Sequence, residues 1–310
     1  MGQTLAWMVF GAVIVIMMAL DLGVFNRRAH EVSFREALTW SAIWISLALL
    51  FNLGVWWWRG QESALLFLTG YLVEESLSVD NLFVFIIIFS YFRVPSQYQH
   101  KVLFWGILGA VVMRGLFIAT GVTLIHRFHW LIYLFGLFLI YTGLRLAWQK
   151  EKKELEPDKN IFVRILRRFF PVTSQFEGSR FFVRQGGRWL VTPLLVTVLV
   201  VESTDVIFAL DSIPAILAIT TDPFLVYTSN IFAILGLRSL YFALSGFMRM
   251  FHYLNYGLAV ILAFIGVKMT LSDLYHMPIQ LALGFIAVVL AVSILASVIW
   301  KPKAGAEPQG

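Results

Sequence analysis

The chain of 310 residues is 59% hydrophobic and only 14% charged, with a mean hydropathy of +0.80, whereas soluble domains average about 45–50% apolar and about 25% charged residues. An ordinary soluble fold is therefore excluded, and the lack of cysteine in the sequence also excludes disulfides, thiolate metal sites and iron–sulfur clusters. The net charge of +6 comes mostly from basic residues between apolar runs, so it indicates membrane topology rather than nucleic-acid binding.

Long apolar runs follow one another along the chain, and each can cross a hydrocarbon core about 30 Å thick. No segment alternates as the strands of a membrane β-barrel do, so every run is expected to be a helix. The predicted fold is an all-α polytopic membrane protein with about nine transmembrane helices, at about 4–25, 37–57, 63–91, 102–124, 130–147, 191–219, 225–247, 255–271 and 278–299.

Basic residues concentrate in alternate loops between these helices. The loops after the first, third, fifth and seventh helices and the C-terminal tail carry most of them, whereas the opposite side has only Arg59 and Arg127. By the positive-inside rule the N-terminus is expected outside and the C-terminus in the cytoplasm.

The segment 148–190 is the only long polar stretch, with ten Lys/Arg and five Asp/Glu residues. It is expected to be a cytoplasmic or interfacial linker. Residues 161–170 (IFVRILRRFF) have an amphipathic helical pattern with arginines on the polar side. Such a helix is typical of a membrane interface with anionic lipid, and a docking site for a membrane-complex partner is the alternative.

An internal repeat relates the third to fifth helices to the sixth to eighth. Residues 128–133 (FHWLIY) match 251–256 (FHYLNY) at an offset of 123, 143–145 (GLR) match 266–268 (GVK) at the same offset, and Arg114 matches Arg238 at 124. Because three helices are an odd number, the second copy is expected to be inverted, a common transporter plan with the site at the repeat interface. The expected parts are two N-terminal helices (1–62), the first repeat (63–147), the linker (148–190), the second repeat (191–271), and the last helix with the tail (272–310).

Seven acids lie within or at the edge of the apolar runs, where a carboxylate costs about 2.5–3.5 kcal/mol at the bilayer centre. They are Asp21, Glu74, Glu75, Asp80, Glu202, Asp205 and Asp211. Arg114 and Arg238 are the basic residues expected to face them. The resulting excess of negative charge must be protonated, solvated or neutralised by a cation. The alternative is that the acids only pair with these arginines and brace the bundle.

The acids cluster in the first helix of each repeat copy, and both copies contain an acid, five residues, Asp, and then Asn or Ser. A spacing of six turns a helix by about 240°, so Glu74 and Asp80 would not share a face. Two acids six residues apart converge only if their helix unwinds locally or if the facing copy supplies the partner. In the second copy, Pro214 offers a reason for unwinding. Carboxylate, amide and hydroxyl oxygens suit hard cations such as Mn²⁺, Mg²⁺ or Ca²⁺.

Three segments resemble signature segments of the TerC family of integral membrane proteins: residues 19–27 (ALDLGVFNR), 72–85 (LVEESLSVDNLFVF) and 202–214 (ESTDVIFALDSIP). The resemblance runs from about 15 to 300 and implies a bacterial inner-membrane exporter similar to the lysine-exporter superfamily. Manganese efflux is the activity that it implies, with Glu74, Asp80, Glu202 and Asp211 at the functional positions. The family is associated with tellurite resistance, which we expect to be indirect because an acid-lined core repels an oxyanion.

The leading hypothesis is therefore secondary export of Mn²⁺ or another hard divalent cation, coupled to protons, without a permanently bound cofactor. The predicted metal ligands are Glu74, Asp80, Glu202, Asp205 and Asp211, supported by Ser78, Asn81, Ser203, Ser212, Asp21, Arg114 and Arg238. A non-transporting scaffold for a secretion or stress-response complex, and an exporter of a small amino compound, are the alternatives. No nucleotide-binding or nucleophile motif is present, so an enzyme is not expected.

Overall fold

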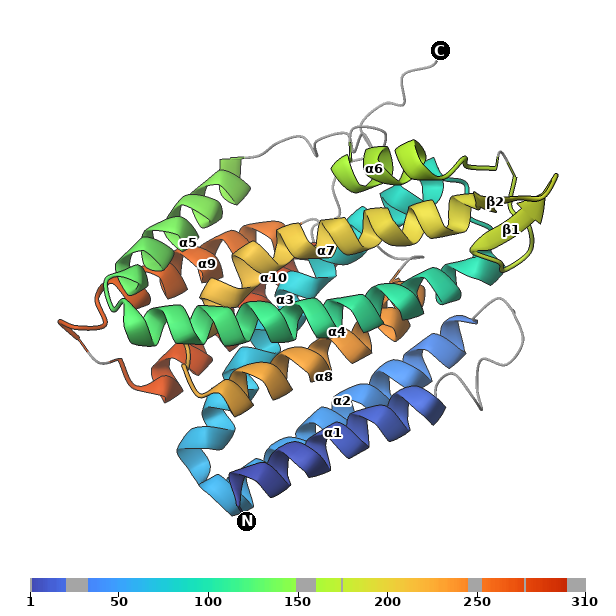
Figure 1. The fold of residues 1–310 in the computed structure, drawn as a ribbon. Helices are drawn as coiled ribbons and strands as arrows, with labels where there is room; N and C mark the ends of the chain where they lie inside the picture. Colours follow the sequence, from blue (N-terminus) through green and yellow to red (C-terminus); the bar gives the residue numbers. More distant parts are fainter. Residues whose placement is uncertain are drawn as a thin grey trace.

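The computed structural model describes residues 2–20, 33–148, 160–173, 175–244, 253–275 and 277–299. These ranges form ten helices and two short strands (Figure 1). The elements are α1 (Gln3–Leu20), α2 (Phe34–Arg59), α3 (Gln61–Tyr91), α4 (Ser96–Arg127), α5 (Leu131–Trp148), α6 (Ile161–Phe169), β1 (Phe182–Gln185), β2 (Arg188–Val191), α7 (Pro193–Leu217), α8 (Pro223–Leu244), α9 (Leu254–Thr270) and α10 (Ile279–Ile299).

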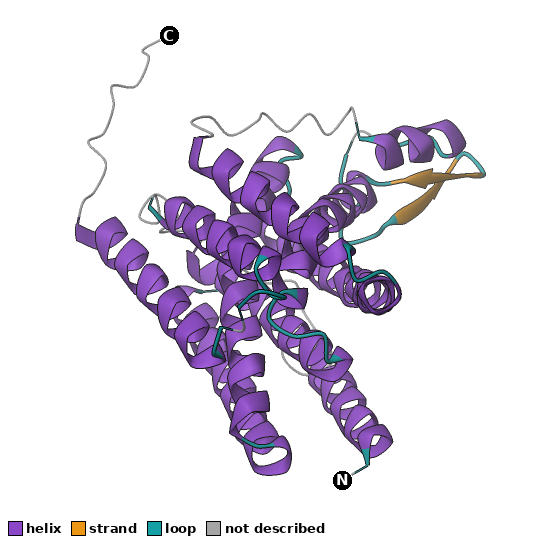
Figure 2. Ribbon diagram, turned by 90° about the vertical axis from the view of Figure 1, so that its left-hand side faces the viewer, coloured by secondary structure: helices purple, strands orange, loops and turns teal. Residues whose placement is uncertain are grey.

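The prediction of an all-helical multi-pass membrane protein is confirmed. Among the described residues, six helices are long and apolar enough to cross a membrane, namely α2, α4, α5, α7, α8 and α10. Fewer helices than the nine expected meet this criterion, because α1 and α9 contain shorter apolar stretches and the 31-residue α3 carries the first acidic cluster. The long helices lie side by side as one bundle (Figures 1 and 2).

The linker contains a β-hairpin that the sequence analysis missed. Strands β1 and β2 pair antiparallel, with Gln185 opposite Arg188. Gly186 and Gly187 form the turn with φ of +57° and +80°, a backbone region that glycine adopts without strain and that two-residue hairpins require. The Gly-Gly pair, with apolar residues on either side at 182–183 and 189–191, was the signal for this hairpin. The amphipathic helix expected at 161–170 is confirmed as α6.

Helix packing places the two acid-rich helices in the middle of the bundle. Helix α3 packs on both α7 and α8, and α4 packs on the same two helices. On one side α1 and α2 join α8 through an aromatic cluster, and on the other side α5 packs closely on α9. Helix α7 remains helical from Pro193 to Leu217 although Pro214 lies within it, so Pro214 does not unwind the acidic stretch. Convergence of acids must therefore come from facing helices.

Candidate functional site

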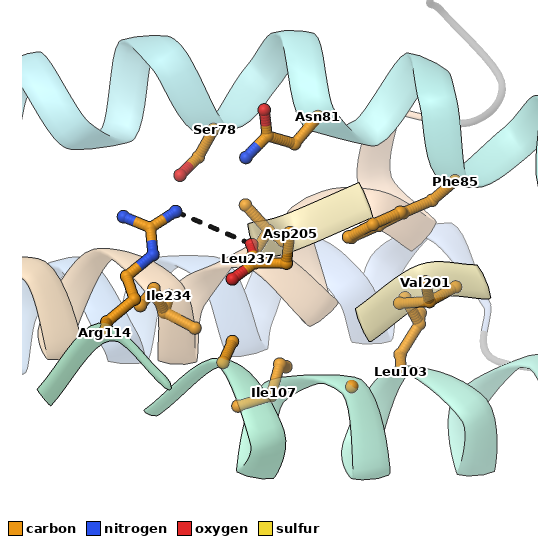
Figure 3. A pocket seen from close by; sticks show the side chains of 12 residues that line it. Ser78, Asn81, Phe85, Leu103, Ile107, Arg114, Val201, Asp205, Ile234 and Leu237 are labelled. Carbon is orange, nitrogen blue, oxygen red and sulfur yellow. Dashed lines mark ion pairs between the residues drawn. The ribbon is translucent and has the colours of Figure 1, made fainter. Parts of the chain in front are cut away.

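Arg114 forms the centre of a buried charge cluster in which four helices meet. Its side chain, from the middle of α4, is only 1% exposed. One guanidinium nitrogen, Nη1, donates to Glu74 of α3 and to Oδ1 of Asn230 of α8, the latter at 2.6 Å. The other, Nη2, lies 3.6 Å from Oδ1 of Asp205 on α7, an ion pair that Figure 3 shows. The facing helix, and not a break in α3 or α7, thus brings Glu74 and Asp205 together.

This cluster contains more carboxylate than it can satisfy. Glu74 is 1% exposed and Asp205 6% exposed, and one guanidinium faces both of them. Among the described residues, Oε2 of Glu74 and Oδ2 of Asp205 are buried without a hydrogen-bond partner. Buried ionised oxygens are costly unless they are paired. With both acids ionised, the cluster carries one net negative charge and free acceptor oxygens, which a proton or a metal cation can neutralise.

A small cavity lies beside the Arg114–Asp205 pair. Its polar lining comes from Ser78, Asn81, Arg114 and Asp205, and its apolar lining includes Phe85 and Leu103 (Figure 3). The cavity volume is about 10 Å³, close to the smallest space that holds one water molecule. The Ser78 hydroxyl faces no hydrogen-bond partner in the described part of the chain. In the conformation shown, this cavity is too small for a hydrated ion.

A second, larger cavity of about 220 Å³ lies on the other side of Asn81. It is lined by residues from α3, α5, α7 and α9, including Asn81, Thr142, Arg145, Asp211 and Ser212. The Thr142 hydroxyl donates to Oδ1 of Asp211 at 3.4 Å. Asn81 lines both cavities. Its side chain therefore lies between the larger cavity, which contains Asp211, and the small cavity next to Asp205.

Three further predicted site residues, Glu202, Ser203 and Arg238, lie in the described part of the chain. Glu202 is half-buried and sits directly against Gly109 of α4, where a Cβ atom would overlap its carboxylate. Ser203 accepts a hydrogen bond from Asn160, which lies before α6, at 2.5 Å. Arg238 is half-buried in α8. Asp21 lies outside the described residues, and so does the side chain of Asp80, although Asp80 belongs to α3.

The four predicted metal ligands whose side chains the structure describes, Glu74, Glu202, Asp205 and Asp211, do not form one compact cluster in this conformation. Within the described ranges, no group of three or more His, Asp or Glu side chains could hold a metal ion. The structure brings together Glu74 and Asp205, and it places Asp211 in the neighbouring chamber. Sequence reasoning missed Asn230 and Thr142. A polar Asn230 within an apolar helix was the available signal, because a buried amide needs hydrogen-bond partners.

Comparisons with known proteins found a matching family and several similar proteins. The family described as "Integral membrane protein TerC family" matches residues 59–305. The membrane protein STKORF319 of Myxococcus xanthus is 54% identical over 298 residues, covering 96% of this chain and 93% of its own. Relatives from Salmonella typhi and Escherichia coli K12 are 49% and 48% identical, each covering 95% of this chain and 94% of its own length. Both carry the provisional name membrane-bound redox modulator Alx.

No solved structure matches the chain significantly. The family match covers well over half of the sequence and includes both acidic helices, α3 and α7. The chain therefore belongs to the TerC family of integral membrane proteins.

Proposed function

We propose that this protein is a secondary transporter that exports a divalent metal cation, with Mn²⁺ as the first candidate, in exchange for protons. The observation that carries the proposal is the buried Glu74–Arg114–Asp205 cluster, which has two carboxylates for one guanidinium. Intramembrane ionisable groups are rare and mark ion or proton pathways when they are not fully paired. The free oxygens of Glu74 and Asp205 are the type of ligand that hard cations take.

The two cavities suggest a route for the cation. A hydrated ion would enter the chamber of about 220 Å³, where Asp211, Ser212, Thr142 and Asn81 offer oxygen atoms. Passage beyond Asn81 requires the cavity of about 10 Å³ to widen, together with loss of water from the ion. Asp205 and Glu74 would then replace the lost water, and protonation of these acids would release the ion.

Reciprocal contacts between α5 and α9 support the inverted repeat. A Cβ atom on Gly143 would meet the backbone of Ala259 and Ala263, and a Cβ atom on Gly266 would meet the backbone of Gly136 and Ile140. All three pairs of positions (143 and 266, 136 and 259, 140 and 263) differ by the offset of 123 that relates the repeats in sequence. A two-fold axis between α5 and α9 would produce this pattern.

The same axis fits the remaining helices of the two copies. The first helix of each copy packs on the second helix of the other, because α3 packs on α8 and α7 packs on α4. A two-fold axis that relates the copies requires this pattern. Rocking of one repeat against the other would give alternating access. With the N-terminus outside and the C-terminus in the cytoplasm, the linker and its basic residues would lie on the cytoplasmic side of a bacterial inner membrane.

The test replaces one acid in each copy, as Asp80→Asn and Asp211→Asn. Each variant is expected to lose Mn²⁺ efflux while inserting into the membrane in normal amounts, because the amide keeps the size of the carboxyl group and removes its charge. The matched control is Glu62→Gln in the first turn of α3, outside both cavities. Unchanged efflux in both aspartate variants would rule out the site, and loss of efflux in the control would make the effect nonspecific.

The name of the Alx relatives favours a second candidate, modulation of the cell's redox state. The 310 residues contain no cysteine, so thiol–disulfide exchange within this chain cannot provide it. We propose that any redox effect follows indirectly from the metal that the protein moves. Two alternatives remain, a scaffold role through 148–190 and export of a small amino compound. Deletion of 148–190 would abolish a scaffold phenotype, whereas a carrier would keep metal flux in vesicles. An exported amino compound would compete with Mn²⁺ for binding.

A further inference from the structure

Helix α6 and the β1–β2 hairpin form a basic module, residues 160–192, that is attached to the end of the bundle where α4 and α7 begin (Figures 1 and 2). Asn160 caps α6 by accepting from the backbone of Phe162 and Val163, and it donates to Ser203 of α7. Val163 is buried against the core. Lys101 of α4 donates to the Ser179 carbonyl and lies 4.4 Å from the centre of the Phe181 ring. The module is therefore anchored to both helices.

The outward side of α6 carries an apolar stripe and a basic stripe side by side, and exposure of the apolar one to water would be unfavourable. At about 100° per residue, Val163 and Leu166 face the protein. The next stripe is apolar and exposed by 49–71%, and it consists of Ile161, Phe162, Ile165 and Phe169. The third stripe is basic and exposed, and it consists of Arg164, Arg167 and Arg168. A helix with adjacent apolar and cationic stripes is stable at the boundary between acyl chains and headgroups.

The hairpin extends the same pattern. Trp189 and Phe182 are 58% and 48% exposed, and Arg184 pairs directly across from Trp189 in the ladder. Tryptophan is enriched where acyl chains meet headgroups. Across 160–192 the sequence has six arginines and one acid, Glu177. This surplus of positive charge complements an anionic headgroup layer, whereas a neutral lipid surface would gain little from it.

The length of α4 is compatible with a position of the module at the membrane surface. Its 32 residues span roughly 48 Å at 1.5 Å per residue, whereas the hydrocarbon core is about 30 Å thick. Part of α4 therefore extends beyond the core, and the end that bears Lys101 is the end to which the module is attached.

We propose that the module binds anionic phospholipid headgroups, with the apolar stripe of α6 inserted among the acyl chains and its arginines in the headgroup layer. Each basic residue near an anionic surface strengthens the attraction about fivefold. Removal of three arginines is therefore expected to weaken the attachment of α6 by about a hundredfold. The hydrogen bond from Asn160 to Ser203 connects this lipid contact to α7 between Glu202 and Asp205.

The lack of native cysteine allows a direct test by single-site spin labelling. The full-length Ile165→Cys variant, carrying a nitroxide, is reconstituted in phosphatidylcholine vesicles with or without phosphatidylglycerol. Collisions with oxygen, which partitions into the bilayer, are compared with collisions with a water-soluble nickel complex. With phosphatidylglycerol, the label is expected to be accessible to oxygen and protected from nickel. Adding R164Q, R167Q and R168Q is expected to reverse this preference.

A triple variant with the same loss of charge, R35Q/R93Q/R127Q, is the matched control, because these exposed arginines lie outside the module. It is expected to keep the label in the bilayer. A second label at Val288→Cys, on the exposed face of α10, reports whether each variant is inserted. The proposal is overturned if the α6 label is nickel-accessible with phosphatidylglycerol, as a water-facing or protein-binding surface would be. It is also overturned if the label is equally protected in pure phosphatidylcholine.

Discussion

Arg114→Met is expected to destabilise the protein by about 3–5 kcal/mol, the usual cost of removing one partner from a buried ion pair. Methionine keeps much of the side-chain volume but leaves Glu74 and Asp205 buried without the guanidinium that contacts both of them. Asn230 also loses its hydrogen bond. The measurement is the thermal unfolding midpoint of the purified protein in detergent, together with the amount of protein that inserts into the membrane.

Arg59→Met is the matched control for this prediction. Arg59 pairs with Asp222 at 2.7 Å, but the two side chains are 20% and 34% exposed, and exposed pairs contribute only about 0–1 kcal/mol. Adding Glu74→Gln and Asp205→Asn to Arg114→Met removes all three charges and should restore much of the stability without restoring transport. Equal midpoints for Arg114→Met and Arg59→Met would contradict the central place of the buried cluster.

Gly143→Ala and Gly266→Ala are each expected to destabilise the protein by about 1–3 kcal/mol, as overpacking does. An added methyl group would lie 2.7–2.8 Å from the α9 backbone at position 143 and 2.6–2.8 Å from Gly136 and Ile140 at position 266. A backbone atom cannot rotate away as a side chain can, so α5 and α9 must separate. Because the two contacts are equivalent in the repeat, the two losses should be similar in size.

Gly54→Ala in α2 and Gly284→Ala in α10 are the controls, since a Cβ atom at either position would meet nothing within 4 Å. Alanine favours a helix over glycine by up to about 1 kcal/mol, so these variants should be neutral or more stable. Thermal midpoints of the four variants decide the matter. A loss in the controls as large as that at Gly143 would mean that close packing of α5 on α9 is not the cause.

The helical class and the position of most helices could be predicted from the sequence because the bilayer leaves few alternatives. In the bilayer core, the backbone N–H and C=O groups of an apolar run must hydrogen-bond to one another, which forms a helix. Length and hydropathy are therefore sufficient to predict α2, α4, α7 and α10. The hairpin was missed because its four-residue strands lie in a polar linker, where hydropathy has no contrast. The turn residues Gly186 and Gly187 carried that information instead.

The site was only partly predictable because it depends on contacts between helices. Sequence spacing indicated that Glu74 and Asp80 could not share a face, but it did not show that Glu74 would meet Asp205 across the bundle. Nor could it show that one arginine, Arg114, contacts both acids while Asp211 lies in a separate chamber. These contacts depend on which faces of α3, α4 and α7 pack together, and apolar composition is similar around all three helices.

Proton-coupled export of a hard cation is tested by measuring ion flux in proteoliposomes across a panel of Mn²⁺, Mg²⁺, Ca²⁺ and Zn²⁺, with and without a pH gradient. An oxygen-lined site should move Mn²⁺ faster than Zn²⁺. A lumen more acidic than the outside should accelerate Mn²⁺ uptake, because protons leave as the metal enters. Because protons leave the lumen as metal ions enter it, Mn²⁺ uptake should be accompanied by alkalinisation of the lumen. A protein that inserts fully but moves none of these cations under either condition would contradict proton-coupled export.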